Sequence, residues 1–148
     1  MLAMYHLHES LGFSLTRVAR ISEQRLDAGL KALGLTRTTW CVLCAVGNEN
    51  LMQPSDIANY LGIDRTAISR ALRQMQLDGF IDRMAGDDDG RTRRVRVTAT
   101  GLDRLARGKP IAEENNRLLI ERIGAEAAED LKEHLDLIIE GAPHVGGI

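Results

Sequence analysis

The sequence predicts a mainly α-helical fold of the α+β class, with one small β-hairpin. Apolar residues recur every three or four positions along most of the chain, which is the spacing of amphipathic helices. Residues 94–97 alternate between arginine and valine, as a half-buried strand does. Residues 84–90, just before that strand, contain two glycines and three aspartates, a composition typical of the loop of a hairpin.

The N-terminal third predicts one long helix, and a second helix follows it. The first ends near Gly34, and its apolar residues at helical spacing are Leu7, Leu11, Leu15, Val18, Leu26 and Leu30. Trp40, Leu43 and Val46 form the apolar stripe of the second helix, over residues 36–46. Residues 48–53 are expected to form a loop.

Two short helices joined by a tight turn come next. Pro54 at the first position and Gly62 just after the last predict a helix over residues 54–61. Asp64 is a suitable N-cap for a second helix over residues 65–78. Two helices joined by a glycine-containing turn of about three or four residues make a helix-turn-helix candidate.

The remaining elements are a hairpin and two helices. Phe80 and Ile81 begin the first strand, and residues 94–97 form the second. A long helix starts near Ala99, and the segment 108–110 with Pro110 is expected to kink it or to start a new segment. A final helix covers residues 125–140, and the glycine-rich C-terminus is expected to fray.

Length and composition indicate one soluble domain. A chain of 148 residues with 44% hydrophobic residues can bury a core of its own. It has no apolar run of about 18 residues and no N-terminal signal pattern, so we expect a cytoplasmic protein. Cys41 and Cys44 lie three residues apart in a helical segment, which does not suggest a disulfide framework and favours a reducing compartment.

Positive charge is concentrated in one part of the chain. The formal net charge is -2, but residues 65–96 contain eight arginines and five aspartates, a net charge of +3. Every basic residue in this window is arginine, whose planar guanidinium suits phosphates and guanine edges. A docking surface needs only local positive charge, so the acidic total does not exclude a nucleic-acid partner.

The helix over residues 65–78 has two chemically different sides. At about 100° per residue, Ile68, Leu72 and Met75 fall on one side. The other side carries Thr66, Ser69, Arg70 and Arg73, with Arg65 at the flank. Arginines, hydroxyls and short side chains are what a helix needs in a major groove, although a solvated amphipathic helix can show the same pattern.

A second arginine cluster favours the DNA-binding interpretation of this helix over a solvated amphipathic helix. Arg91, Arg93, Arg94 and Arg96 follow on the predicted hairpin. A two-stranded element next to a helix-turn-helix can place such residues in a minor groove or on phosphates. Two adjacent clusters favour DNA as the partner.

Much of the chain resembles the MarR (multiple antibiotic resistance regulator) family. The resemblance rests on Leu35-Thr36, Trp40, Val42, Leu43, PSDIANYLGIDRTAISRALRQMQLDGFIDR and DDDGRTRRVRVTATG. Asp89-Gly90-Arg91, Val97-Thr98 and Gly101 match the family pattern of Asp-x-Arg, an apolar residue with Thr, and Gly three residues later. Thr39 stands where many members have glutamine, and Gly90 replaces a commonly basic residue of the wing.

The resemblance implies a single domain over residues 1–148 with two parts. A winged helix-turn-helix DNA-binding lobe covers residues 36–98, and residues 1–34 and 99–148 form a helical dimerisation region. The function implied is a ligand-responsive repressor that binds palindromic operator DNA as a homodimer, with a small aromatic or anionic effector. Neither a cofactor nor a membrane partner is expected.

The same resemblance assigns roles to individual residues. The expected DNA-binding residues are Arg65, Thr66, Ser69, Arg70, Arg73, Arg91, Arg93 and Arg94. Asp89 is expected to orient Arg91 through a charge-assisted bond, because a carboxylate is repelled by phosphate. His8, Arg17 and Trp40 are the candidate effector-binding residues.

Other functions stay open at this stage. The two cysteines could make the protein a thiol-responsive regulator, and its histidines a metal-responsive one, although no recognised zinc spacing is present. A helical protein-interaction module without DNA binding is a further alternative. No Gly-rich phosphate loop, nucleophile elbow or other catalytic motif occurs, so an enzyme is not expected.

Overall fold

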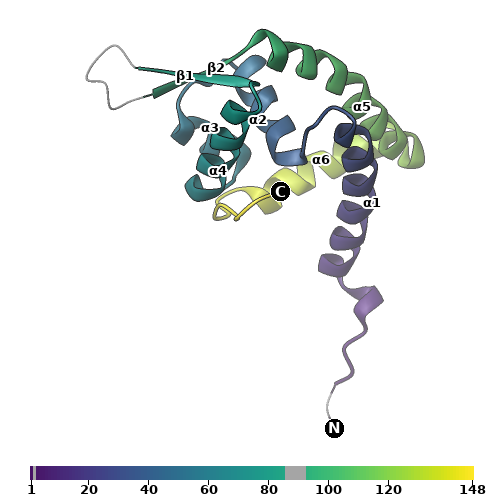
Figure 1. Cartoon of the computed structure of the whole chain (residues 1–148). Coiled ribbons are helices and arrows are strands. Elements are labelled where there is room, and N and C mark those ends of the chain that lie inside the picture. Colours follow the sequence, from purple (N-terminus) through teal and green to yellow (C-terminus); the bar gives the residue numbers. More distant parts are fainter. Residues whose placement is uncertain (2, 86–92) are drawn as a thin grey trace.

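The computed structural model describes residues 1, 3–85 and 93–148 (Figure 1). Its elements are a 3-10 turn (Leu7–Glu9), α1 (Leu11–Lys31), α2 (Arg37–Gly47), α3 (Pro54–Leu61), α4 (Arg65–Leu77), β1 (Ile81–Ala85), β2 (Arg93–Val97), α5 (Ala99–Ile123) and α6 (Ala125–Ile139). The predicted class, mainly helical with a small hairpin, is confirmed.

Side-chain caps set where the helices of this fold begin. The Asp64 carboxylate accepts a hydrogen bond from the Ala67 backbone N–H at 2.8 Å, so the predicted N-cap of α4 is confirmed. Gly62 ends α3 in the left-handed region, with φ of 66°. The predicted continuous first helix is wrong at its start, because Ser10 is extended and caps α1, which leaves the 3-10 turn as a separate element.

Thr39 belongs to the cap of α2. Thr36 and Thr39 form a capping box, in which the Thr39 backbone N–H donates to Thr36 Oγ1 and the Thr36 backbone N–H donates to Thr39 Oγ1. Thr39 is also buried. Threonine at this position therefore has a structural role at the start of the helix.

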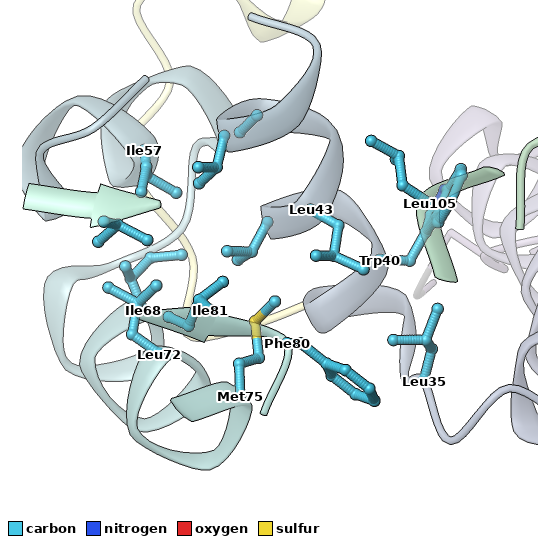
Figure 2. Close-up of a cluster of buried hydrophobic side chains, with 14 of the residues drawn as sticks. Leu35, Trp40, Leu43, Ile57, Ile68, Leu72, Met75, Phe80, Ile81 and Leu105 are labelled. Atoms are coloured by element: carbon cyan, nitrogen blue, oxygen red, sulfur yellow. The ribbon is translucent and has the colours of Figure 1, made fainter. Parts of the chain in front are cut away.

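The hydrophobic core lies between α2, α3, α4 and the base of the hairpin (Figure 2). Its large, fully buried side chains include Leu43, Ile57, Ile63, Ile68, Leu72, Met75, Ile81 and Val95. The core reaches α1 through Leu30 and α5 through Leu105. By contrast, α6 has no buried residue.

β1 and β2 form an antiparallel hairpin that is attached to this core at two points. Val95 is buried and lies opposite Arg83 on β1. Its backbone N–H also donates to the Met52 carbonyl, at 2.7 Å, in the segment before α3. Phe80 is buried at the entrance to β1. The base of the hairpin is therefore fixed to the helices.

Thr98 and Gly101 join the hairpin to α5. The Thr98 side chain caps α5 by accepting from the Gly101 N–H at 3.1 Å, and it donates to the Gly79 carbonyl at 2.5 Å. A Cβ atom on Gly101 would lie only 2.1 Å from the Phe80 carbonyl oxygen. This close approach leaves no room for a side chain at position 101.

α5 continues through Pro110, so the expectation of a new segment there is wrong. Proline removes one backbone hydrogen bond from the helix, but side-chain packing holds α5 on both sides of it. A Cβ on Gly108 would lie 2.4 Å from the Trp40 ring, and Ile111 occupies the space beside Gly29 of α1 in the same way. The glycine that suggested an interruption instead allows Trp40 to pack closely.

The C-terminal segment, which is expected to fray, contacts the lobe at Val145. Val145 forms a parallel β-bridge with Ile63, in the turn between α3 and α4. Its N–H donates to the Gly62 carbonyl at 2.9 Å, and its carbonyl accepts from the Asp64 N–H at 2.8 Å.

Replacing Gly101 with alanine should destabilise the fold. Because the added methyl group meets a backbone carbonyl, Gly101→Ala is expected to lower the free energy of unfolding by about 1–3 kcal/mol, measured by urea denaturation. The matched control is Gly12→Ala in the first turn of α1, where the nearest atom to the new Cβ lies 3.7 Å away. The control should be neutral or slightly stabilising, and equal effects of the two changes would contradict the explanation.

Candidate nucleic-acid interface

α4 has one fully buried side and one exposed side, as its sequence pattern predicts. Ile68, Leu72 and Met75 have 0% exposure. The residues expected to contact DNA are all exposed on the same helix: Arg65, Thr66, Ser69, Arg70 and Arg73. The core contact therefore directs this polar side outward.

The charges on this side of α4 are not neutralised within the chain. In the part of the chain that the structure describes, Arg65, Arg70 and Arg73 form no ion pair. Arg37, at the start of α2, is by contrast neutralised: it forms ion pairs with Glu23 and Asp27 of α1, at 2.6 and 2.8 Å. The α4 guanidinium groups are thus available to an external anion.

The hairpin adds positive charge beside α4. Arg94 and Arg96 are exposed and lie two positions apart on β2, so they share the outer face of the hairpin, opposite the inward-facing Val95. The strand register places Met84 across from Arg94 and Asp82 across from Arg96. Arg96 is not among the predicted DNA-binding residues, although the alternation along β2 already placed it on the face of Arg94.

Part of the predicted site lies where the structure gives no side-chain description. Asp89 and Arg91 fall outside the described residues. Arg93 begins β2, where its backbone pairs with Ala85. The DNA roles of Arg91 and Arg93, and the orienting role of Asp89, stay predictions.

The three candidate effector residues lie in two different places. His8 packs edge-on against Phe13, with ring centroids 5.3 Å apart, and the Arg17 guanidinium lies 6.0 Å from the same ring. Trp40 is buried against Gly108, and it lines a pocket of about 360 Å³ together with Leu105 and Lys109 of α5. In this chain Trp40 is therefore the one of the three that lines this pocket.

Both cysteines are held as neutral thiols. Burial raises the pKa of Cys44 to about 11, and the neighbouring Cys41 and Glu49 add to this shift. Burial also raises the pKa of Cys41, and the nearby Arg37 guanidinium opposes it only in part. A thiol sensor needs a thiolate, so these environments disfavour thiol chemistry.

Among residues 1, 3–85 and 93–148, no three histidine, cysteine or carboxylate side chains gather as a metal site. No helix within the same residues is both long enough and apolar enough to cross a membrane.

A helix-turn-helix packed against a two-stranded hairpin, with an arginine-bearing second helix, defines the winged helix class. Residues 33–92 match the model of the MarR family. Over these residues the chain is similar to the MarR family, and along nearly its whole length it has the fold of a solved transcriptional regulator.

Solved structures share this fold along nearly the whole chain. A probable transcriptional regulator from Pseudomonas aeruginosa is 25% identical, with a TM-score of 0.81 over 90% of this chain and 100% of that one. The PcaV transcriptional regulator from Streptomyces coelicolor, in complex with its natural ligand, is 17% identical, with a TM-score of 0.82 over 95% and 99% of the two chains. A mutant of MarR from E. coli, complexed with operator DNA, is 21% identical, with a TM-score of 0.80 over 87% and 93%.

The thiol environments can be tested by alkylation. At pH 8 a thiol with a pKa of about 11 has on the order of a hundredfold less thiolate than an ordinary cysteine. Iodoacetamide should therefore label Cys44 far more slowly in the native protein than in urea, as followed by peptide mass spectrometry. The native rate should keep rising as the pH is raised above 9. Labelling at pH 8 that is equally fast in both states would instead support a reactive, sensing thiol.

Proposed function

We propose that this protein is a sequence-specific DNA-binding transcriptional regulator that acts as a homodimer on palindromic operator DNA and represses transcription until an effector binds. The observation that carries the proposal is the exposed arginine side of α4, opposite three fully buried side chains. In a helix-turn-helix, the second helix lies in the major groove and reads base edges from its N-terminal residues. Arg65, Thr66 and Ser69 occupy that part of α4.

α4 and the hairpin would make different kinds of contact with DNA. On α4, Arg70 and Arg73 would contact guanine or phosphate, and Thr66 and Ser69 would contact base edges or the backbone. On the hairpin, Arg91 would enter the minor groove, with Arg93 and Arg94 on phosphates. The outer-face position of Arg96 adds it to the phosphate contacts.

The surface area of a single chain supports a homodimer. The chain exposes 10468 Å², whereas a compact monomer of 16.3 kDa exposes about 7,500 Å². The excess of about 3,000 Å² per chain is enough for the roughly 1,000–2,500 Å² that each protomer of an obligate dimer buries. Much of it is apolar and lies outside the lobe: exposed side chains include Leu11, Val18, Ile21, Leu118, Ile123, Leu131, Leu137, Ile138 and Ile139.

A groove opens between α5 and α6, in the helical base formed by residues 1–34 and 99–148. It has a volume of about 680 Å³, and its apolar lining includes Leu119, Ile120, Ile123, Leu131 and Leu135. A second copy that supplies its own apolar helices would fill it. Two lobes related by the dimer axis can then meet half-sites about 34 Å apart, so residues 1–34 and 99–148 serve as the dimerisation region.

The pocket beside Trp40 is the proposed effector site. Trp40 supplies an aromatic wall and Lys109 a cation, which together suit a small aromatic anion. The pocket lies between α2 of the lobe and α5 of the base, so a ligand there can favour one spacing of the two parts. A ligand shifts DNA affinity only if it binds those spacings unequally.

A protein-interaction module is the main alternative, and DNA binding separates the two functions. Duplexes selected from a random pool by the purified protein are expected to share a palindromic consensus. Binding to that sequence should weaken steeply with added salt, because each neutralised phosphate releases counterions. A protein that selects no sequence and ignores duplex DNA would be an interaction module instead.

Arg70→Ala tests the role of α4. The change should weaken binding to the selected duplex by about 1–3 kcal/mol for a base contact, or reduce the salt slope by about one for a phosphate contact. Fluorescence anisotropy titrations over a range of salt measure both quantities. The matched control is Arg107→Ala on α5. It removes the same charge at a position outside the proposed interface, where the Arg107 guanidinium lies 3.6 Å from the Asp103 carboxylate. Unchanged affinity and slope in Arg70→Ala would refute a DNA role for this side of the helix.

Ile123→Glu tests the homodimer. Ile123 lines the α5–α6 groove and is 47% exposed in a single chain, so glutamate is tolerated by the monomer but would be buried in a dimer. Light scattering is expected to give twice 16.3 kDa for the native protein and 16.3 kDa for the variant. Leu77→Glu is the control, because Leu77 is 77% exposed on α4, away from the base. A native protein that scatters as one chain would contradict the proposal.

A further inference from the structure

The C-terminal segment returns from the helical base to the helix-turn-helix. α6 ends at Ile139, and Gly141, with φ of 72°, turns the chain. Figure 1 shows the yellow C-terminal segment below α4, far from the N-terminus of the chain. Val145 then pairs with Ile63 in a parallel β-bridge that uses both of its backbone polar groups.

This bridge lies at the N-terminal end of α4. Its two hydrogen bonds go to the Gly62 carbonyl and to the N–H of Asp64, which is the N-cap of α4. The segment also lies close to the capping side chain: a Cβ on Gly146 would be 3.4 Å from Asp64 Oδ2. The next residues of α4 are Arg65 and Thr66, which are expected to approach the bases.

The contact is made by the backbone and buries little apolar surface. All residues from 140 to 148 are exposed, and Val145 itself is 57% exposed. Two hydrogen bonds to partly exposed groups hold a segment only weakly, because water competes for the same groups. The bridge can therefore open without disturbing the core.

We propose that residues 141–148 form an intramolecular strap that competes with DNA for the N-terminal end of α4. The inference rests on the proposed DNA-binding function. A recognition helix enters the groove by its N-terminal residues, and the strap lies across the cap of that end.

The strap also links the two parts of the chain covalently. It follows α6, which belongs to the helical base, and it binds the turn of the lobe. A shift of α6 relative to the lobe would therefore pull the strap from Ile63 or press it into place. The base can in this way change the fraction of lobes that are open to DNA.

The expected size of the effect follows from the strength of the bridge. Two hydrogen bonds favour the docked strap over the free one by roughly tenfold. Apparent DNA affinity is reduced by the fraction of protein in the open state, so removal of the strap should tighten binding by about tenfold.

The experiment compares three variants of the full protein with the native chain. Val145→Pro removes the N–H that bonds to Gly62 and prevents the bridge, and a chain ended after Glu140 lacks the strap. Val145→Ala keeps both backbone groups and is the matched control. No buried residue is removed in any of them, because residues 140–148 are exposed.

Two measurements are made on each protein. Amide hydrogen exchange by NMR should show the Asp64 N–H protected in the native chain and in Val145→Ala, and exchanging faster in the other two. Anisotropy with a selected duplex should show about tenfold tighter binding for Val145→Pro and for the shortened chain, and native affinity for Val145→Ala.

The outcomes separate the strap from the DNA function. An unprotected Asp64 amide in the native chain, or affinity that is equal or weaker without the strap, overturns the strap alone. If no variant binds duplex DNA in a salt-dependent way, the proposed DNA function fails and the strap fails with it.

Discussion

The apolar contact between α4 and the rest of the lobe determines what this protein can present to a partner. Ile68, Leu72 and Met75 lie on one side of the helix and are completely buried against α2, α3 and the base of the hairpin. Because these side chains are one or two turns apart, the helix has only one orientation in which all three are buried. Arg70 and Arg73 must then face solvent. The arginine surface is a direct consequence of core packing.

Burial is distributed unevenly along the chain. The lobe is closed around a dense core, whereas α6 has no buried residue, and Leu30 is the buried residue of α1. A helix with an uncovered apolar side is stabilised mainly by tertiary packing. The exposed apolar side chains of the base therefore need another surface to cover them. This is why the area of a single chain and the groove between α5 and α6 both support a second copy.

The contacts between base and lobe are of two kinds. The apolar contacts are close-packed: Trp40 of α2 packs against Gly108 of α5, and the buried Leu30 and Leu105 extend the core into α1 and α5. The polar contacts lie nearer the surface: Arg37 pairs with Glu23 and Asp27 of α1, and the Arg104 guanidinium lies 5.9 Å from the Phe80 ring centroid. Surface ion pairs contribute only about 0–1 kcal/mol each. The apolar contacts therefore hold the base to the lobe, and the surface ion pairs add little to them.

Features that depend only on neighbouring residues could be predicted from the amino-acid sequence. Pro54, Gly62 and Asp64 marked the ends of α3 and α4, because capping and left-handed backbone are local effects. The side of α4 that faces outward followed from helical spacing alone. Tertiary structure decided the rest. Pro110 stays inside α5 because Trp40 and Gly29 pack on either side of it, and the C-terminal segment contacts the lobe because it pairs with a turn more than seventy residues earlier. Such contacts join residues that are distant along the chain, so no local pattern encodes them.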